Sequence, residues 1–371
     1  MSRPFFSIII PCYNPGKFLR RTLTSILLQK MGKEDIEVVL SDDNSPEDYS
    51  DIIAEFNDKL TIKTTKTAYN CCPGNTRQQG TTIATGEWMT FMDQDDEWYP
   101  EVLPRVKAAI IGSKEDIYMV TDFNEVAENG TIRNQFRGCL NWCHGKFYNK
   151  DNFWDKYKIS FKKDLKSHED IYICSTVNCL LNTVGRNARY FKLVTYKWNA
   201  NPESLSRSVY VNEYGGRYFL EAHFSDYVES TGYVYLEKYM DGTVEKSYAF
   251  RAAVEVTAFC YFYVMSFMFR KPKDYFKENI DTARSYIEAV KELFEVTNSE
   301  IYLELAKDNA FLYDFVLKNS KVASGPFIPE VTIKQWLDGL VPDENPADVV
   351  ELNSAVAHVM NENAHKITED K

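Results

Sequence analysis

Gly86-Glu-Trp-Met-Thr-Phe-Met-Asp-Gln-Asp-Asp-Glu-Trp98 is the stretch on which the fold depends, because in it a short apolar run ends in a cluster of acids. The apolar side chains predict a strand that is buried on both faces, as in a parallel sheet covered by helices. The acids Asp93, Asp95, Asp96 and Glu97 follow its carboxyl end, where open α/β sheets bind ligands. These carboxylates repel one another, and a divalent cation that also binds phosphate oxygens would offset the repulsion. A solvated acidic turn is the alternative interpretation.

The composition excludes several classes of protein. The chain has 371 residues, 44% of them hydrophobic, and a formal net charge of -11, which predicts a soluble protein with one large domain and an appendage. The negative charge disfavours a polyanionic partner but is compatible with a phosphate chelated by a metal. The 8 scattered cysteines are typical of reduced thiols in the cytoplasm. We expect no signal peptide, and the apolar run at 252–269, interrupted by Glu255, predicts a buried helix and no transmembrane segment.

Three strand-and-helix units precede the acidic stretch. Strands are predicted at 5–10, 36–40 and 60–63, and each is followed by a turn and a segment of helical character. In the first unit, Asn14 before Pro15 is typical of a helix N-cap with proline at the first helical position. Repeated units of this kind predict an α/β fold with a mostly parallel, Rossmann-like sheet flanked by helices.

Polar residues follow these strands as well. Asp42 and Asp43 come directly after the second strand, and Arg77 lies on the third helix. Each has a structural interpretation, since Asp-Asp-Asn-Ser is good turn chemistry and an arginine suits a solvated helix face. Their shared position near the carboxyl ends of the strands predicts that one crevice collects them.

Four motifs together resemble those of family 2 glycosyltransferases, in the same order and spacing. They read Phe-Ser-Ile-Ile-Ile-Pro-Cys-Tyr-Asn-Pro at 6–15, Glu-Val-Val-Leu-Ser-Asp-Asp-Asn-Ser at 37–45, Gly-Asn-Thr-Arg-Gln-Gln-Gly at 74–80 with Ala-Thr-Gly-Glu-Trp at 84–88, and Phe-Met-Asp-Gln-Asp-Asp-Glu-Trp at 91–98. The resemblance covers residues 5–207. It implies a transferase of nucleotide-diphospho-sugars with a GT-A type fold, a divalent metal (Mn²⁺ or Mg²⁺) and inversion at the anomeric carbon.

The resemblance also implies roles for single residues. The pocket for the base and ribose of the donor would be lined by Pro11, Tyr13, Asn14, Asp42 and Asp43. Arg77 would lie beside the base or the phosphates, Asp93 and Gln94 would contact the nucleotide-sugar, and Asp95 would bind the metal. A metal that bridges two phosphates offsets the charge developing on the leaving nucleoside diphosphate.

The second half of the resemblance carries the expected base. After 117–122 the pattern predicts mixed strands that build the acceptor side. His144 stands in an element that resembles the family's Asn-Lys-Leu-Tyr type. The alternative is that His144 is a hydrogen-bonded loop residue. His168-Glu169-Asp170 resembles the family's second acidic motif, in which the aspartate of a Glu-Asp pair is the catalytic base. Stabilisation by the helix dipole is the alternative for Glu169 and Asp170. Arg207, in a loop similar to the one that closes the catalytic domain, is expected to reach the diphosphate.

Two domains are therefore expected, a GT-A type catalytic domain at 1–214 and a mainly α-helical C-terminal domain at 215–371 that shapes the acceptor site or mediates homo-oligomer formation. The predicted function is a metal-dependent, inverting glycosyltransferase of the cytoplasm that uses a UDP-linked or similar nucleotide-sugar. A polysaccharide or teichoic-type polymer, a lipid-linked sugar, a protein and a modified base in phage DNA remain open as acceptors. The alternatives are a sugar-nucleotide-binding scaffold without turnover and a nucleotidyltransferase, for which the first strand lacks a glycine-rich, lysine-bearing phosphate loop.

Overall fold

The structure is a computed structural model that describes residues 3–202 apart from 114 and 164, then 204, 209–212, 215–218 and the single positions 230, 234 and 242. The chain divides into two compact units, Met1–Ser208 and Val209–Lys371. In the second unit, β10 (Val209–Asn212) pairs with β11 (Gly215–Tyr218) as an antiparallel hairpin. Arg207 and the predicted C-terminal helices lie outside the described residues, and the boundary predicted after residue 214 stays a prediction. Among the helices that are described, none is long and apolar enough to cross a membrane.

Four parallel strands form one half of the main sheet, in the order β3-β2-β1-β4. They are β1 (Phe6–Cys12), β2 (Ile36–Asp42), β3 (Thr61–Lys66) and β4 (Trp88–Phe91). Side chains of β2 and β4 are buried along the whole strand, as expected where helices cover both faces of a sheet. The predicted parallel arrangement is confirmed, and the polar residues after β1, β2 and β4 come to one edge of the sheet.

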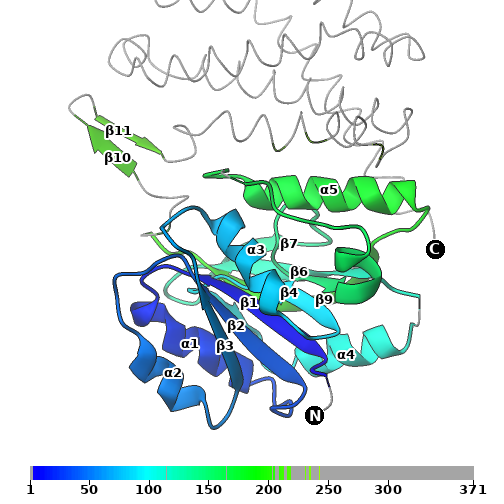
Figure 1. The fold of residues 1–371 in the computed structure, drawn as a ribbon, viewed down its shortest axis with the longest axis horizontal. Helices are drawn as coiled ribbons and strands as arrows, with labels where there is room; N and C mark the ends of the chain where they lie inside the picture. The colour runs from blue at the N-terminus through cyan, green and yellow to red at the C-terminus, as the bar shows by residue number, and fades with distance from the viewer. Residues whose placement is uncertain are drawn as a thin grey trace, which may run out of the picture. The chain divides into compact units, whose positions relative to one another are not determined.

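Helices cover both faces of this sheet (Figure 1). The helices are α1 (Gly16–Leu27), α2 (Ser50–Phe56), α3 (Pro73–Ile83), α4 (Leu103–Ile111) and α5 (Glu169–Thr183). Alternate residues of β1 point to opposite faces, so that Ile8 belongs to the apolar layer under α1, whereas Ile9 belongs to the layer under α5. The two layers together hold the carboxyl edge of the sheet in place.

The start of α1 differs from the prediction. The residue before the helix is Pro15, which makes no side-chain cap, so Asn14 lies one position further out. Asn14 has a positive φ of 48°, a region that asparagine tolerates better than most residues. Its Oδ1 accepts the Glu47 N–H at 3.3 Å, and this bond ties the turn after β1 to the turn after β2. Asn14 therefore shapes the edge of the sheet and does not cap the helix.

Beyond β4 the sheet becomes mixed, as the sequence predicts. β8 (Lys146–Asn149) pairs antiparallel with β4 and with β6 (Tyr118–Val126), and β9 (Arg189–Asn199) runs parallel to β6. β5 (Glu97–Trp98) pairs antiparallel with the end of β9, and β7 (Ile132–Phe136) forms a hairpin with β6. The pairing of β5 with β9 places the acidic stretch beside the carboxyl end of β9.

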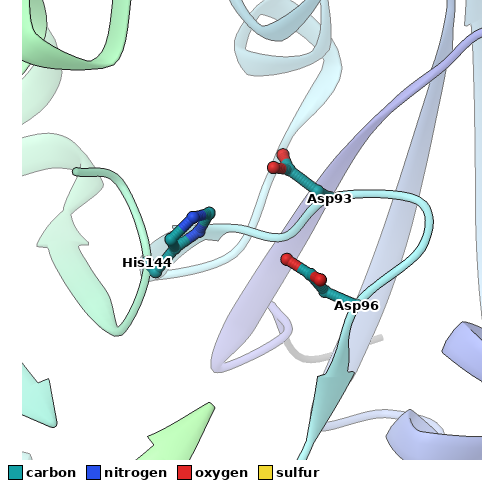
Figure 2. A group of neighbouring side chains, drawn as sticks. All are labelled: Asp93, Asp96 and His144. Atoms are coloured by element: carbon teal, nitrogen blue, oxygen red, sulfur yellow. The ribbon is translucent and has the colours of Figure 1, made fainter. Parts of the chain in front are cut away.

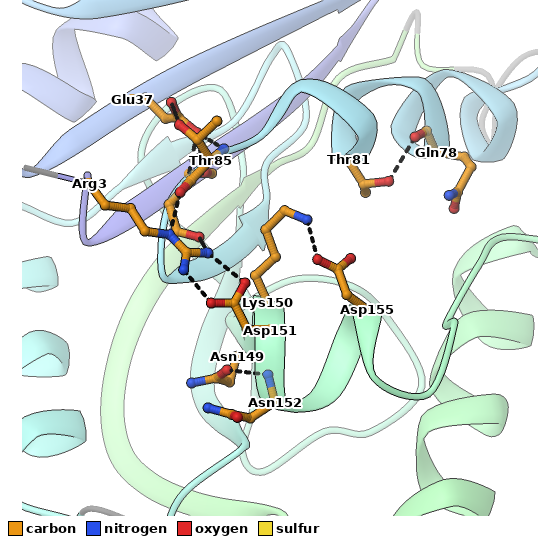
Figure 3. A network of polar contacts seen from close by, with 12 residues as sticks. Arg3, Glu37, Gln78, Thr81, Thr85, Asn149, Lys150, Asp151, Asn152 and Asp155 are labelled. Carbon is orange, nitrogen blue, oxygen red and sulfur yellow. Dashed lines mark hydrogen bonds and ion pairs between the residues drawn. The ribbon is translucent and has the colours of Figure 1, made fainter.

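A polar network fixes the strands at the opposite edge of the sheet (Figure 3). The side chain of Glu37 is 1% exposed, pairs with Lys63 at 2.8 Å and accepts a hydrogen bond from Thr85 Oγ1 at 2.7 Å. Arg3 donates to the carbonyl oxygen of Gly86 at 2.8 Å. These contacts hold the turn that leads into β4, and so they fix where the acids emerge at the other end of that strand.

Candidate active site

The acids of the central stretch form a tight turn between β4 and β5. The N–H of Asp96 donates to the carbonyl oxygen of Asp93 at 3.2 Å, which closes the turn. Thr22 Oγ1 on α1 bonds to the carbonyl oxygens of Gln94 and Asp96 at 2.7 and 3.0 Å. These bonds reach main-chain atoms of the turn and hold it against α1.

Asp96 is the structural member of the cluster. It is 0% exposed, and it accepts the Tyr196 hydroxyl on Oδ2 and the Asn199 N–H on Oδ1, both at 2.7 Å. Burial raises the pKa of Asp96 well above its usual value, and the charges of Asp95 and Asp93 raise it further. Asp96 therefore anchors the acidic turn to β9.

Asp95 lies nearer the surface. It is half-buried, and its Oδ2 accepts a hydrogen bond from Asn201 Nδ2 at 2.8 Å. Burial raises the pKa of Asp95, and the neighbouring charge of Asp93 adds to the effect. A cation bound here would offset both causes, so the chemistry of the residue fits the divalent metal predicted for it.

Asp93, Asp96 and His144 offer ligand atoms that all lie within 4.8 Å of one another, and Figure 2 shows the three side chains converging. His144 is buried and its ring stacks on Tyr196 with centroids 5.0 Å apart. Burial lowers the pKa of His144 to about 4, so the ring is neutral at pH 7, which is the form that binds metals. The carboxylates and the imidazole therefore make a donor set that fits a divalent cation.

Sequence reasoning assigned no role to His144 in this cluster. Its ring reaches the acids because β8, which follows it, pairs with both β4 and β6. In the sequence, only the glycine after His144 hints at this position. Gly145 has a φ of 65°, and a Cβ there would lie 2.8 Å from Thr121 Oγ1, so the loop needs a glycine at this point. The close approach of this loop to β6 brings the imidazole to the acids.

Arg77 joins the two acidic motifs. It is 6% exposed and forms ion pairs with Asp93 Oδ1 at 2.7 Å and with Glu169 Oε1. Burial alone would lower the pKa of Arg77, but the charges of the two carboxylates outweigh burial and raise it well above its usual value. The helix-face interpretation is wrong, because the side chain points inward between α3 and α5. Contact of Arg77 with the donor stays a prediction.

The predicted base lies at the start of α5. Asp170 is half-buried, and its Oδ1 accepts the N–H of Ile171 at 2.8 Å. Burial raises the pKa of Asp170 well above its usual value, and the adjacent charge of Glu169 contributes. Glu169 is paired with Arg77, whereas Asp170 has the raised pKa that suits a proton acceptor; its role as the base stays a prediction.

The residues predicted to bind the nucleotide lie at the carboxyl ends of β1 and β2. Pro11 is paired with Ser41 in the sheet, next to Asp42. Gln94 joins this region to the acidic turn, because it accepts the Tyr13 N–H at 2.7 Å and donates to the Tyr13 carbonyl at 3.0 Å. The structure thus brings together the predicted residues of the first, second and fourth motifs.

Asp42 and Asp43 are buried and already have partners. Asp42 Oδ1 accepts the Ser45 N–H at 2.7 Å, and Asp43 Oδ1 accepts the Cys71 N–H at 2.9 Å and the Thr67 hydroxyl at 3.1 Å. Such bonds from a carboxylate to nearby main-chain N–H groups are what the interpretation of Asp42 and Asp43 as turn residues predicts. They also hold the loop at 67–71 against the end of β2, where the loop borders the pocket predicted for the nucleobase of the donor.

Comparisons with known proteins bear on this site. The family described as "Glycosyl transferase family 2" matches residues 7–182. The PGL/p-HBAD biosynthesis glycosyltransferase of Mycobacterium tuberculosis (strain ATCC 25177 / H37Ra) is 30% identical over 233 residues, which are 58% of this chain and 80% of that one. The poly(ribitol-phosphate) beta-N-acetylglucosaminyltransferase TarS of Staphylococcus aureus (strain Mu50 / ATCC 700699) is 30% identical over 224 residues, 56% of this chain and 38% of that one. The chain thus matches well under half of the TarS sequence.

Solved structures agree on the fold. The crystal structure of S. aureus TarS 1–349 in complex with UDP-GlcNAc has a TM-score of 0.57 and 21% sequence identity, and the match covers 86% of this chain and 92% of that one. At this identity the likeness shows the fold, a GT-A type sheet with flanking helices, and nothing further.

Proposed function

The chain belongs to glycosyl transferase family 2 and is an enzyme, and from that premise we propose that it moves a sugar from a UDP-linked donor to an acceptor hydroxyl with inversion at the anomeric carbon. One observation carries the proposal: a single guanidinium, that of Arg77, pairs with Asp93 of the donor motif and Glu169 of the base motif. Two motifs separated in the sequence thereby form one site. The scaffold and nucleotidyltransferase alternatives have no support in the family assignment.

The donor would lie along the edge formed by β1, β2 and the acidic turn. Pro11, Tyr13 and the Asp42-Asp43 pair would surround the base and ribose, and Asp95 would hold a divalent metal, Mn²⁺ or Mg²⁺. When bound, the metal would neutralise negative charge on the diphosphate. The raised pKa of Asp95 supports this assignment, because it reflects burial and a neighbouring charge that a cation would compensate.

Asp170 would act as the general base. It would take the proton of the acceptor hydroxyl while the acceptor oxygen attacks the anomeric carbon. The bond from that carbon to the diphosphate oxygen breaks, and its electron pair leaves with UDP. Attack from the face opposite to the leaving group inverts the configuration. The helix start supports this role, because the Ile171 N–H fixes one carboxylate oxygen of Asp170.

The relatives support a proposal for the acceptor. TarS and the Bacillus spizizenii poly(ribitol-phosphate) beta-glucosyltransferase, which is 35% identical over 101 residues, are both named for a polymer acceptor. We propose that this chain also modifies a bacterial glycan polymer, and that it does so in the cytoplasm while the polymer is being made. The C-terminal domain at 215–371 would contribute to the acceptor side or to self-association.

The test is a screen of nucleotide-sugars for UDP release by the full chain, with Mn²⁺, with Mg²⁺ and with a chelator. We expect one UDP-sugar to be hydrolysed slowly without an acceptor, more quickly with one, and not at all with the chelator. Asp170→Asn should abolish the acceptor-dependent rate. Release of a nucleoside monophosphate instead of UDP, or undiminished release in the chelator, would contradict the proposal.

A further inference from the structure

A row of lysines precedes the base motif in the chain. Residues 156–166 read Lys-Tyr-Lys-Ile-Ser-Phe-Lys-Lys-Asp-Leu-Lys, so five lysines stand beside one acid in a chain whose formal net charge is -11. The lysine strip consists of Lys156, Lys158, Lys162, Lys163 and Lys166. All of them are exposed except Lys162, which is half-buried. The lysine strip therefore carries a charge of opposite sign to that of the whole chain.

Buried apolar side chains hold the lysine strip against the body of the protein. Ile159, Phe161 and Leu165 are only 2–3% exposed, and the first two belong to the apolar layer under α5. The Phe161 N–H also donates to Gln78 Oε1 on α3 at 3.1 Å. The lysines between these anchors are thus presented to solvent from a fixed backbone.

The lysine strip reaches the first turn of α5. A Cβ on Gly74, at the start of α3, would lie 3.0 Å from the Cβ of Glu169 and 3.7 Å from the Cβ of Phe161. Phe161 and Glu169 therefore flank the same glycine. The next residue, Lys162, places its Nζ over the ring of Tyr172, 5.7 Å from the centroid, and Tyr172 follows the proposed base by two residues on α5. A chain bound along the lysine strip would be led to that base.

Two of these lysines lack an acidic partner. In the part of the chain that the structure describes, no carboxylate forms an ion pair with Lys158 or Lys163, whereas Lys150, just before the lysine strip, pairs with Asp155 at 2.6 Å. Neighbouring like charges repel one another, and a bound polyanion would offset that repulsion. The negative charge elsewhere on the protein opposes such binding only weakly, because salt screens exposed charges beyond about 8 Å at physiological ionic strength.

We propose that the lysine strip is the docking surface for the acceptor polymer, and that this polymer is anionic, with phosphodiester groups that pair with the ammonium groups. The proposal rests on the proposed function and names the acceptor class for that same site. A chain of repeated phosphates can meet several lysines at once while one of its hydroxyls reaches the base. Several linked contacts raise the affinity above that of a single phosphate, since the later contacts form within one bound molecule.

Two other interpretations fit less well. A solvated face accounts for exposed lysines, but charges of both signs are normally interspersed on such a face, and here five lysines have one acid among them. An anionic membrane surface is typically bound by basic residues together with exposed apolar ones. Ile159, Phe161 and Leu165 are buried in the core, so they are not offered to a bilayer.

The experiment measures polymer binding by the full chain without turnover. The probe is a fluorescein-labelled ribitol phosphate oligomer, in which phosphodiesters join neutral polyols, and a dextran oligomer of similar length is the neutral comparison. Fluorescence anisotropy gives the Kd of each between about 0.05 and 0.2 M NaCl. We expect the phosphodiester oligomer to bind, its affinity to fall as the salt concentration rises, and the dextran oligomer not to bind.

Lys158→Gly removes one charge at little cost to the fold, because Lys158 has a φ of 52°, which glycine adopts freely. It should raise the Kd of the phosphodiester oligomer roughly threefold, the scale of one exposed ion pair. Lys158→Gly combined with Lys163→Gln should raise the Kd roughly tenfold. Melting temperatures close to that of the wild type would show that neither loss of affinity comes from unfolding.

Lys59→Gln is the matched control for Lys156→Gln. Both lysines are exposed and lie over a neighbouring ring, Lys59 over Phe56 with its Nζ 5.9 Å from the centroid and Lys156 over Tyr157 at 5.2 Å. Phe56 belongs to the apolar layer under α1, whereas Tyr157 packs against the layer under α5. Lys156→Gln should weaken oligomer binding roughly threefold, and Lys59→Gln should leave it unchanged.

Three results would overturn the inference: equal oligomer affinity in the wild type and the double variant, affinity that does not change with salt, or an equal loss in Lys59→Gln. Binding to phosphatidylglycerol vesicles in preference to the oligomer would also overturn it, since the lysine strip would then serve a membrane. UDP affinity and UDP release without acceptor are measured on the same proteins and should not change in the strip variants. Because these are separate readouts, failure of polymer binding would leave the proposed transferase activity standing.

Discussion

Arg77 and Glu169 form a buried ion pair although they lie 92 residues apart in the chain. The second nitrogen of the same guanidinium binds Asp93, so one cation compensates two acids that belong to different motifs. The helix that carries Asp170 is therefore tied to the acidic turn through Arg77. Any change that removes this cation therefore leaves an uncompensated acid in each of the two motifs.

Arg77→Met should unfold at clearly lower denaturant concentration than the wild type. Removing one partner of a buried ion pair leaves uncompensated charges and costs about 3 kcal/mol. Arg77→Lys should lose less, since an ammonium group can still compensate one acid. Urea unfolding followed by tryptophan fluorescence measures both. Arg20→Met is the control, because Arg20 also pairs with two acids, Asp51 and Glu55, but at the surface. An equal loss of unfolding free energy in the Arg20 and Arg77 variants would show that burial of the Arg77 ion pairs does not increase their contribution to stability.

Most of the parallel half of the fold could be predicted from the sequence. There, β1, β2 and β4 are mainly apolar, and acids mark the ends of β2 and β4 at Asp42 and Asp93, whereas β3 is mainly Thr and Lys. The strand period and the helical spacing are local properties, so a single sequence carries them. That the first, second and fourth motifs share one edge of the sheet follows from parallel pairing.

The partners of the acids could not be predicted in the same way. Tyr196 and Asn199 bind Asp96 from β9, a long strand with partly exposed side chains and no chemical signature. Its pairing with β5 depends on tertiary contacts between segments a hundred residues apart, which local patterns do not encode. For the same reason the sequence left His144 as a loop residue and placed Arg77 on a solvated face or near the donor.

Glu37→Gln should flatten the dependence of stability on pH in the acid range. Burial alone would raise the pKa of Glu37, but hydrogen bonds from Lys63, Ser7 and Thr85 outweigh it and lower the pKa below its usual value. Its contribution to stability is therefore present above the unfolded pKa of about 4.3 and is lost as the pH falls through the folded value. Urea unfolding of both proteins between pH 7 and pH 3 measures the effect. Curves that stay parallel over this range would contradict the prediction.

Asp95→Asn should abolish the part of UDP affinity that depends on manganese and should leave the melting temperature almost unchanged. The fold is expected to survive because Thr22 holds the acidic turn through main-chain oxygens of Gln94 and Asp96. Calorimetry with UDP, with and without Mn²⁺, measures the metal-dependent affinity. Asp96→Asn is the comparison, because it removes an anchor to β9 and should lower the melting temperature. Manganese-dependent affinity that persists in Asp95→Asn would assign the metal to the group of Asp93, Asp96 and His144.

Asp170→Asn should separate chemistry from binding. The asparagine keeps the oxygen that accepts the Ile171 N–H, so the start of α5 is preserved, but the amide cannot take up a proton. General-base assistance is worth roughly 10² to 10⁴ in rate, whereas a lost capping contact costs on the order of 1 kcal/mol of stability. We therefore expect unchanged UDP affinity, an unchanged melting temperature and a loss of nearly all acceptor-dependent UDP release.

Glu169→Gln is the internal control for Asp170→Asn. From the structure we expect the opposite result for it: lower stability with sugar transfer retained. Glu169 compensates Arg77, so its neutralisation should lower the melting temperature while the base one residue later still works. The two variants are compared by single-turnover transfer at saturating donor, together with thermal unfolding. Were Glu169→Gln inactive at full stability and Asp170→Asn active, the base would be Glu169, and Arg77 would have to release it during the reaction. If both variants transferred sugar at the wild-type rate, neither acid at the start of α5 would be the base.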